Sequence, residues 1–111
     1  MKCKTCKPHT DCYVPDEYPI YKASAYGTVP ANEQAIMDEV YRHGPVACGI
    51  AVSKQLLDYK GGVLIDTSGL GPQDIDHDVS IVGFGVENGV KYWQVRNSWG
   101  HHYGEKGFFR I

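Results

Sequence analysis

The sequence has no long apolar run, no excess of positive charge and no low-complexity stretch, repeat or linker. A membrane-spanning helix needs about 20 apolar residues, and no run here approaches that length, so we expect no membrane partner. Eleven Lys and Arg oppose thirteen Asp and Glu, for a formal net charge of −2. Without a basic excess to neutralise phosphates, nucleic acid is excluded as the main partner. The first residues also lack the apolar core of a signal peptide.

The residues that are present fit one folded domain. The chain has 111 residues, of which 42% are hydrophobic and 22% are charged, and these shares are ordinary for a soluble globular protein. Eight Tyr and thirteen Gly favour strands joined by tight turns over a helix bundle. We expect a single domain over 1–111, with a Cys-rich loop at 1–12 and the body of the fold at 13–111.

One main helix is expected at about 31–43. Its apolar positions recur on one face at the helical period, as Ile36, Met37, Val40 and Tyr41 show. Asn32 can cap its start, and Gly44-Pro45 stops it. A single helical turn is expected at 54–59.

The remaining elements are predicted strands, so the fold class is α+β with β-structure dominant. Asn88-Gly89 between two apolar runs is typical of a type I′ hairpin turn. A polar loop is expected at 66–76 and a Gly-rich loop at 97–107. The predicted strands lie at about 21–26, 46–52, 63–65, 77–87, 90–96 and 108–111.

His77 begins one strand of this hairpin, and Asn97 follows its partner. Residues at equal distances from the turn face each other in an antiparallel pair. The two positions are three residues out of register, which a bulge or twist at Gly83 or Gly85 could absorb. We therefore expect His77 and Asn97 to be neighbours. A His held by an Asn amide is the orienting half of a nucleophile–base–orienter site.

Several short motifs together resemble the papain-like cysteine proteases, the cathepsins among them. The resemblance covers about residues 20–111, with the motifs in the family's order and spacing. It implies the right-hand domain of a papain-like fold, an antiparallel barrel-like sheet with one main helix. The motifs are Gly44-Pro45-Val46, Asp76-His77, Val-Gly-Phe-Gly at 82–85, Tyr92-Trp93, Asn97-Ser98-Trp99-Gly100 and Gly104-Glu105-Lys106-Gly107-Phe108.

The resemblance also implies the role of each site residue. His77 would be the catalytic imidazole, Asn97 its orienter, and Trp99 the ring that keeps water from their hydrogen bond. The function implied is that of a cysteine-type peptidase, which cleaves a peptide or protein substrate by acyl transfer without a cofactor or metal. The substrate pocket would be lined by Gly49, Ile75 and Asp78.

The sequence departs from the family pattern at the nucleophile. No Cys is followed by Trp, and no Gln precedes a Cys at the family's spacing. The chain is therefore expected to supply His77 and Asn97, to need an N-terminal left-hand domain that carries the nucleophilic Cys, and to be inactive alone. The alternative is a non-catalytic remnant or binding module that keeps the fold. Position 103 is Tyr, where the family usually has Trp.

The cysteine cluster permits two interpretations. Cys3, Cys6, His9 and Cys12 recur at every third residue, as a Cys₃His zinc set could. The family resemblance instead implies a Cys6–Cys12 disulfide and no metal. It leaves Cys3 and Cys48 without their usual partners, so they are either unpaired or paired with each other. It also implies a lysosomal or secreted location for the parent protein.

Overall fold

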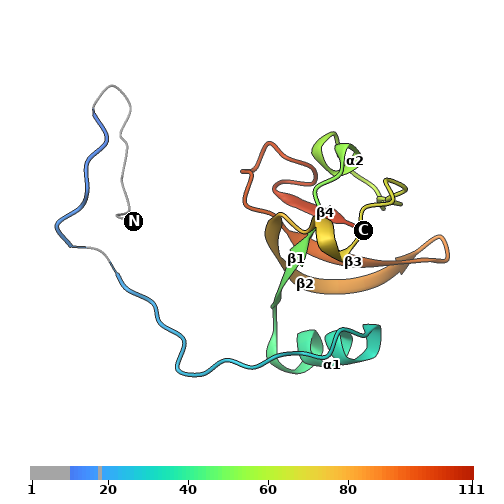
Figure 1. Ribbon diagram of the computed structural model, residues 1–111, viewed down its shortest axis with the longest axis horizontal. Helices are drawn as coiled ribbons and strands as arrows, with labels where there is room; N and C mark the ends of the chain where they lie inside the picture. The colour runs from blue at the N-terminus through green and yellow to red at the C-terminus, as the bar shows by residue number, and fades with distance from the viewer. Residues whose placement is uncertain (1–10, 18) are drawn as a thin grey trace.

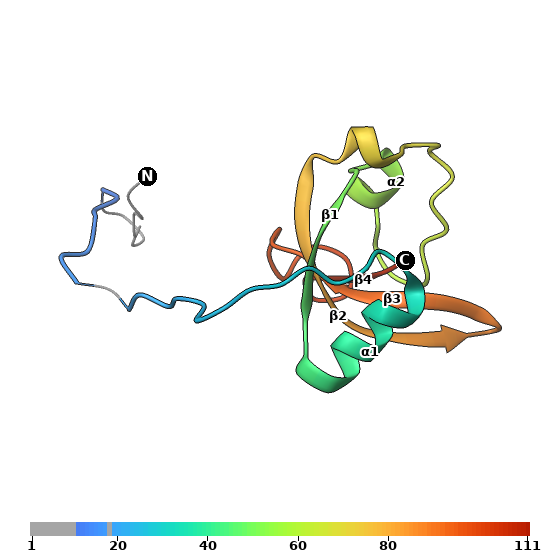
Figure 2. The same ribbon diagram turned by 60° about the horizontal axis from the view of Figure 1, so that its bottom comes forward.

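The computed structural model describes residues 11–17 and 19–111, and its central feature is a four-stranded antiparallel sheet with the order β1-β2-β3-β4 (Figure 1). Helix α1 lies on one side of the sheet, and α2 lies on the other with the loop that follows it (Figures 1 and 2). The elements are α1 Glu33–His43, β1 Val46–Ile50, α2 Lys54–Leu57, a 3-10 turn η1 at Pro72–Asp74, β2 His77–Glu87, β3 Val90–Arg96 and β4 Phe108–Arg110.

Helix α1 begins and ends at the predicted signals. The Asn32 side chain accepts a hydrogen bond from the Ala35 amide at 2.9 Å, which caps the first turn. Gly44 has a φ of +105°, in the left-handed region that glycine adopts freely, and its amide donates to the Val40 carbonyl. The helix is therefore two residues shorter at its start than the predicted 31–43.

The β2–β3 hairpin has the predicted bounds. Asn88 and Gly89 have φ values of +50° and +80°, which are the positive angles of a type I′ turn. This turn matches the right-handed twist of the strands that it joins. The hairpin is the longest paired region of the sheet, and it fixes where β2 starts and where β3 ends.

Two predicted strands are wrong. Residues 21–26 form no strand and have no paired backbone, because no described strand lies beside them, and Tyr21 and Tyr26 are almost fully exposed. This segment extends away from the body of the fold (Figure 2). Of 63–65, only Val63 makes a bridge, to Arg110. Among the described residues, the sheet is not a closed barrel, because β1 and β4 do not pair with each other.

The core lies against β2, β3 and β4. Phe109 and Leu56 are fully buried there, and Leu56 comes from α2. The packing therefore fixes α2 above the same strands that carry the hairpin. The buried apolar residues are Leu56, Tyr59, Val79, Ile81, Val95 and Phe109.

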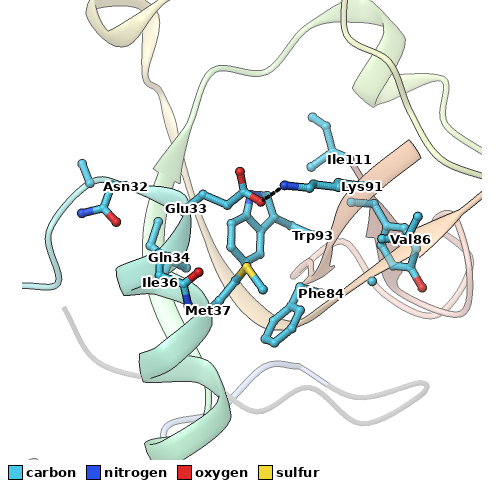
Figure 3. A pocket seen from close by; sticks show the side chains of 13 residues that line it. Asn32, Glu33, Gln34, Ile36, Met37, Phe84, Val86, Lys91, Trp93 and Ile111 are labelled. Carbon is cyan, nitrogen blue, oxygen red and sulfur yellow. Dashed lines mark hydrogen bonds and ion pairs between the residues drawn. The ribbon is translucent and has the colours of Figure 1, made fainter. Parts of the chain in front are cut away.

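A groove of about 700 Å³ lies between α1 and the hairpin (Figure 3). A 2.7 Å ion pair between Lys91 and Glu33 joins the two elements beside it. Its apolar wall includes Ile36, Met37, Phe84, Trp93 and Ile111. Among the described residues, no helix has the length and apolar character to cross a membrane.

Candidate active site

The strand register brings the first residue of β2 to the end of β3. Ser80 pairs with Arg96, and a bulge between Ile81 and Gly83 shifts the register by one residue. The bulge is at Val82, and not at Gly83 or Gly85 as expected. Beyond the last pair, His77 and Asn97 lie diagonally across the two strands. Diagonal neighbours have Cα atoms about 7–8 Å apart, within reach of long side chains.

The side chains of His77 and Asn97 are joined by a hydrogen bond. His77 Nε2 lies 2.8 Å from Asn97 Oδ1. An amide oxygen only accepts hydrogen bonds, so Nε2 must carry the proton. In the neutral ring, Nδ1 is then the atom with a free lone pair. This arrangement can take a proton at Nδ1 while the ring is held in place through Nε2.

Trp99 covers this pair. Its ring stacks on the His77 ring, with centroids 5.0 Å apart and planes inclined by 21°. Tyr103 meets Trp99 edge-on, at 4.8 Å and 83°. The indole is thus held between the imidazole and a second aromatic ring, so it limits water near the hydrogen bond.

Asn97 is held by its backbone as well as by its side chain. It is only 8% exposed. Its backbone amide donates to the Gly107 carbonyl at 3.0 Å, and its side-chain Oδ1 also accepts from the Ser98 backbone amide at 2.8 Å. The loop from 97 to 107 is therefore folded back on its own start, which fixes Oδ1 toward His77.

The three predicted pocket residues are neighbours. Gly49 pairs with Asp78 in the β1–β2 ladder. A Cβ at Gly49 would lie 2.6 Å from Ile75 Cγ2, so only glycine leaves room for the Ile75 side chain there. All three are exposed, and Ile75 is 52% exposed. Side chains alternate along a strand, so Asp78 points to the face opposite His77.

The thiol of Cys48 is free and half-buried on β1. Burial raises the pKa of this thiol, and the charge of Asp78 raises it further. A nucleophilic cysteine needs the reverse, a lowered pKa. Cys48 therefore has the character of a packing residue, in contact with the core cluster.

The proposed Cys6–Cys12 disulfide and the zinc alternative cannot be placed in this fold. Cys3, Cys6 and His9 lie outside the described residues. Within residues 11–17 and 19–111, no three His, Cys, Asp or Glu side chains are grouped to hold a metal ion.

Two residues near the site, Asp76 and Tyr103, make contacts that the sequence does not predict. Asp76 Oδ1 accepts from the Val52 amide at 3.0 Å, and the Asp76 amide donates to the Ile50 carbonyl. These bonds hold the loop before His77 against the end of β1. Tyr103 departs from the family's usual Trp, and its ring supports Trp99. The sequence signal for this role is the replacement of the family's usual Trp by Tyr at position 103.

The cavities do not coincide with the imidazole. The large groove beside α1 includes neither His77 nor Asn97. A smaller hollow of about 260 Å³ includes Asn97 and the loop up to Phe108. His77 is half-buried at the end of the sheet, against the Trp99 ring.

The described fold brings one imidazole and one side-chain amide together at the end of an antiparallel sheet. In comparison with known proteins, residues 2–111 match the papain family cysteine proteases. The chain belongs to this family.

Among curated proteins, the chain is 44% identical to "Cathepsin Z" of Onchocerca volvulus over 99% of its own length and 35% of that protein. It is also 44% identical to "Cathepsin B-like cysteine proteinase 3" of Caenorhabditis elegans, over 98% of its length and 30% of that protein. The chain therefore spans about a third of the length of these relatives.

Solved structures show the same relationship. Procathepsin L 3 from the larval midgut of Tenebrio molitor superposes with a TM-score of 0.67 and 39% identity, over 71% of this chain and 26% of that one. Bromelain from Ananas comosus, in complex with the E64 inhibitor, gives a TM-score of 0.67 and 36% identity, over 74% and 37%. The right-hand-domain fold expected from the motifs is confirmed.

Proposed function

We propose that this chain supplies the imidazole and the orienting amide of a cysteine-type peptidase. The observation that carries the proposal is the 2.8 Å contact between His77 Nε2 and Asn97 Oδ1, beneath the stacked ring of Trp99. This contact orients the ring and leaves Nδ1 as the atom that can exchange a proton with a thiol.

In the proposed reaction, the thiol proton of a nucleophilic Cys passes to His77 Nδ1. The resulting thiolate and imidazolium form an ion pair, which keeps the thiolate available near neutral pH. The thiolate attacks a peptide carbonyl, and His77 then protonates the leaving amine. In the second step His77 takes a proton from water, which hydrolyses the thioester and releases the thiol. Asn97 stabilises both charge states of the ring without adding a charge.

The nucleophile in this proposal comes from a left-hand domain outside these 111 residues. The raised pKa of the Cys48 thiol argues against its use as the nucleophile. The proposal therefore includes an inactive isolated chain, a peptide or protein substrate, and a pocket that Gly49, Ile75 and Asp78 line. The Cys6–Cys12 disulfide and a lysosomal or secreted location belong to the same proposal.

The test provides a nucleophile-bearing domain for this chain. The chain is fused to, or expressed with, the nucleophile-bearing domain of a papain-family relative, and hydrolysis of fluorogenic dipeptidyl substrates is measured. We expect turnover that an epoxide thiol trap abolishes, and none from the chain alone. His77→Ala should lower kcat about 10²–10⁴-fold, the usual effect of losing a general base.

His101→Ala is the matched control, because this His lies exposed in the loop after Trp99. Its activity should equal that of the parent. If the fused protein binds peptides but shows no turnover that depends on His77, the chain is a non-catalytic binding module instead.

A further inference from the structure

In the side-chain amide of Asn97, the oxygen is hydrogen-bonded and the nitrogen is not. Oδ1 accepts two hydrogen bonds, from His77 and from the Ser98 amide. Nδ2 is buried and makes no bond within ordinary hydrogen-bond geometry. A buried amide donor without an acceptor is destabilising. An acceptor on the Nδ2 side would therefore favour the side-chain orientation in which Oδ1 faces His77.

The hydroxyl of Tyr103 has the capacity to accept a hydrogen bond. It donates its own proton to the Leu56 carbonyl at 2.7 Å, so its oxygen is left to accept. Burial raises the pKa of Tyr103 to about 12, and the Asn97 side chain opposes that rise.

The backbone of the 97–107 loop fixes both residues in one unit. The backbone amide of Asn97 donates to the Gly107 carbonyl, and the backbone amide of Gly107 donates to the Tyr103 carbonyl at 2.8 Å. The Tyr103 ring also supports Trp99, which stacks on His77. Tyr103 therefore contacts the covering ring and borders the orienting amide.

We propose that Tyr103 is a positioning residue for the His77–Asn97 pair, and that its hydroxyl accepts a hydrogen bond from Asn97 Nδ2 while it donates to the Leu56 carbonyl. This contact keeps Oδ1 toward His77. With the amide turned by half a turn, Nδ2 would face the ring, and His77 would have to carry its proton on Nδ1. The nitrogen required to receive the thiol proton would then be blocked. The inference rests on the proposed function for its catalytic meaning.

The experiment compares Tyr103→Phe with the parent. This change keeps the aromatic ring against Trp99 and removes only the hydroxyl. In the 111-residue chain, the ¹⁵N shifts of the His77 ring report the ratio of the Nε2–H to the Nδ1–H form. We expect that ratio to fall at least about five-fold in Tyr103→Phe, as the loss of one hydrogen bond implies. The Asn97 side-chain NH₂ protons should exchange faster with water.

Tyr59→Phe is the matched control. Tyr59 is a buried neighbour whose hydroxyl donates to the Gly62 carbonyl at 2.6 Å, away from Asn97. It should lower the unfolding midpoint without changing the His77 proton ratio. In Asn97→Ala, the further change Tyr103→Phe should have no additional effect on that ratio, because the hydroxyl acts through the amide.

The proposal is overturned if Tyr103→Phe leaves the His77 ratio at the parent value while Asn97→Ala changes it. An equal change in Tyr59→Phe would also overturn it, because the effect would then be one of general stability. Neither result depends on turnover, so failure here is separate from failure of the proposed function. In an active fused enzyme, Tyr103→Phe should lower kcat and leave KM nearly unchanged.

Discussion

The rings of His77 and Trp99 are stacked, with centroids 5.0 Å apart and an interplanar angle of 21°. This contact covers one face of the imidazole and shields the bond from Nε2 to Asn97. Because Trp99 follows Asn97 by two residues, the same short motif supplies the orienting amide and its cover.

Removing that cover should expose the hydrogen bond to water. In Trp99→Ala, we expect the His77 Nε2 proton to exchange with solvent at least about ten-fold faster than in the parent, measured by NMR. Trp93→Phe is the control, because Trp93 meets Phe84 edge-on beside the α1 groove and does not line the His77 pair. Unchanged exchange in Trp99→Ala would contradict the shielding role.

The position of Asp78 gives a prediction on specificity. Asp78 lies opposite Gly49 in the ladder and is exposed, so its charge can face a bound substrate side chain. In the fused enzyme, Asp78→Ala should lower the ratio of kcat/KM for Arg over Leu substrates by about five-fold or more. Asp38→Ala, an equal charge change on exposed α1, should leave the ratio unchanged. If the two variants behave alike, Asp78 does not line the pocket.

The cysteine cluster gives a prediction on covalent structure. The Cys6–Cys12 disulfide stays a prediction, because Cys6 lies outside the described residues. In protein made under oxidising conditions, non-reducing peptide mapping should recover a peptide pair joined through these two residues. The loop is short, so its closure has a small entropic cost. One equivalent of bound zinc with all three N-terminal thiols engaged would support the metal interpretation instead.

The hairpin and α1 were predictable because their signals are local. Asn88-Gly89 specifies the turn that it forms, and Asn32 with Gly44 marks the ends of the helix. The strand at 21–26 was predicted wrongly for the opposite reason. Alternating apolar residues satisfy the pattern of a strand, but pairing depends on a neighbour that the pattern does not encode.

The site was predictable only in part. The register arithmetic placed His77 near Asn97, and their contact in the fold agrees with it. The bulge at Val82 was placed wrongly at a glycine, because a bulge of this kind does not require one. The link from Tyr103 to Leu56 spans 47 positions and leaves no local signal.

A final prediction concerns pH and the carboxylate of Glu105. Arg110 donates to both oxygens of this group, at 3.0 and 2.8 Å, and the Gly62 amide donates to Oε1 at 3.0 Å. These bonds lower the pKa of Glu105 from its ordinary 4.5, with the Arg110 hydrogen bonds as the largest cause. The native state therefore binds this proton less tightly than the unfolded chain does.

It follows that ionised Glu105 stabilises the fold at pH values above 4.5, and that this contribution is lost as the pH falls through the lowered native pKa. Glu105→Gln keeps an oxygen for the Gly62 amide and removes the charge. At pH 7 it should lower the free energy of unfolding by about 1 kcal/mol, a value reduced for the partial exposure of the pair. The difference from the parent should shrink steadily as denaturation is repeated below pH 4.5.

Glu33→Gln provides the comparison for this experiment. Its ion pair with Lys91 is more exposed, at 54% and 74% of the two side chains, so water screens it and little stability should be lost at any pH. A deficit in Glu105→Gln that stays constant from pH 7 to strongly acid conditions would show that shape, and not charge, explains the loss. A loss of stability that disappears in acid would assign the effect to the ion pair between Glu105 and Arg110. This pair holds the loop after Tyr103 against β4.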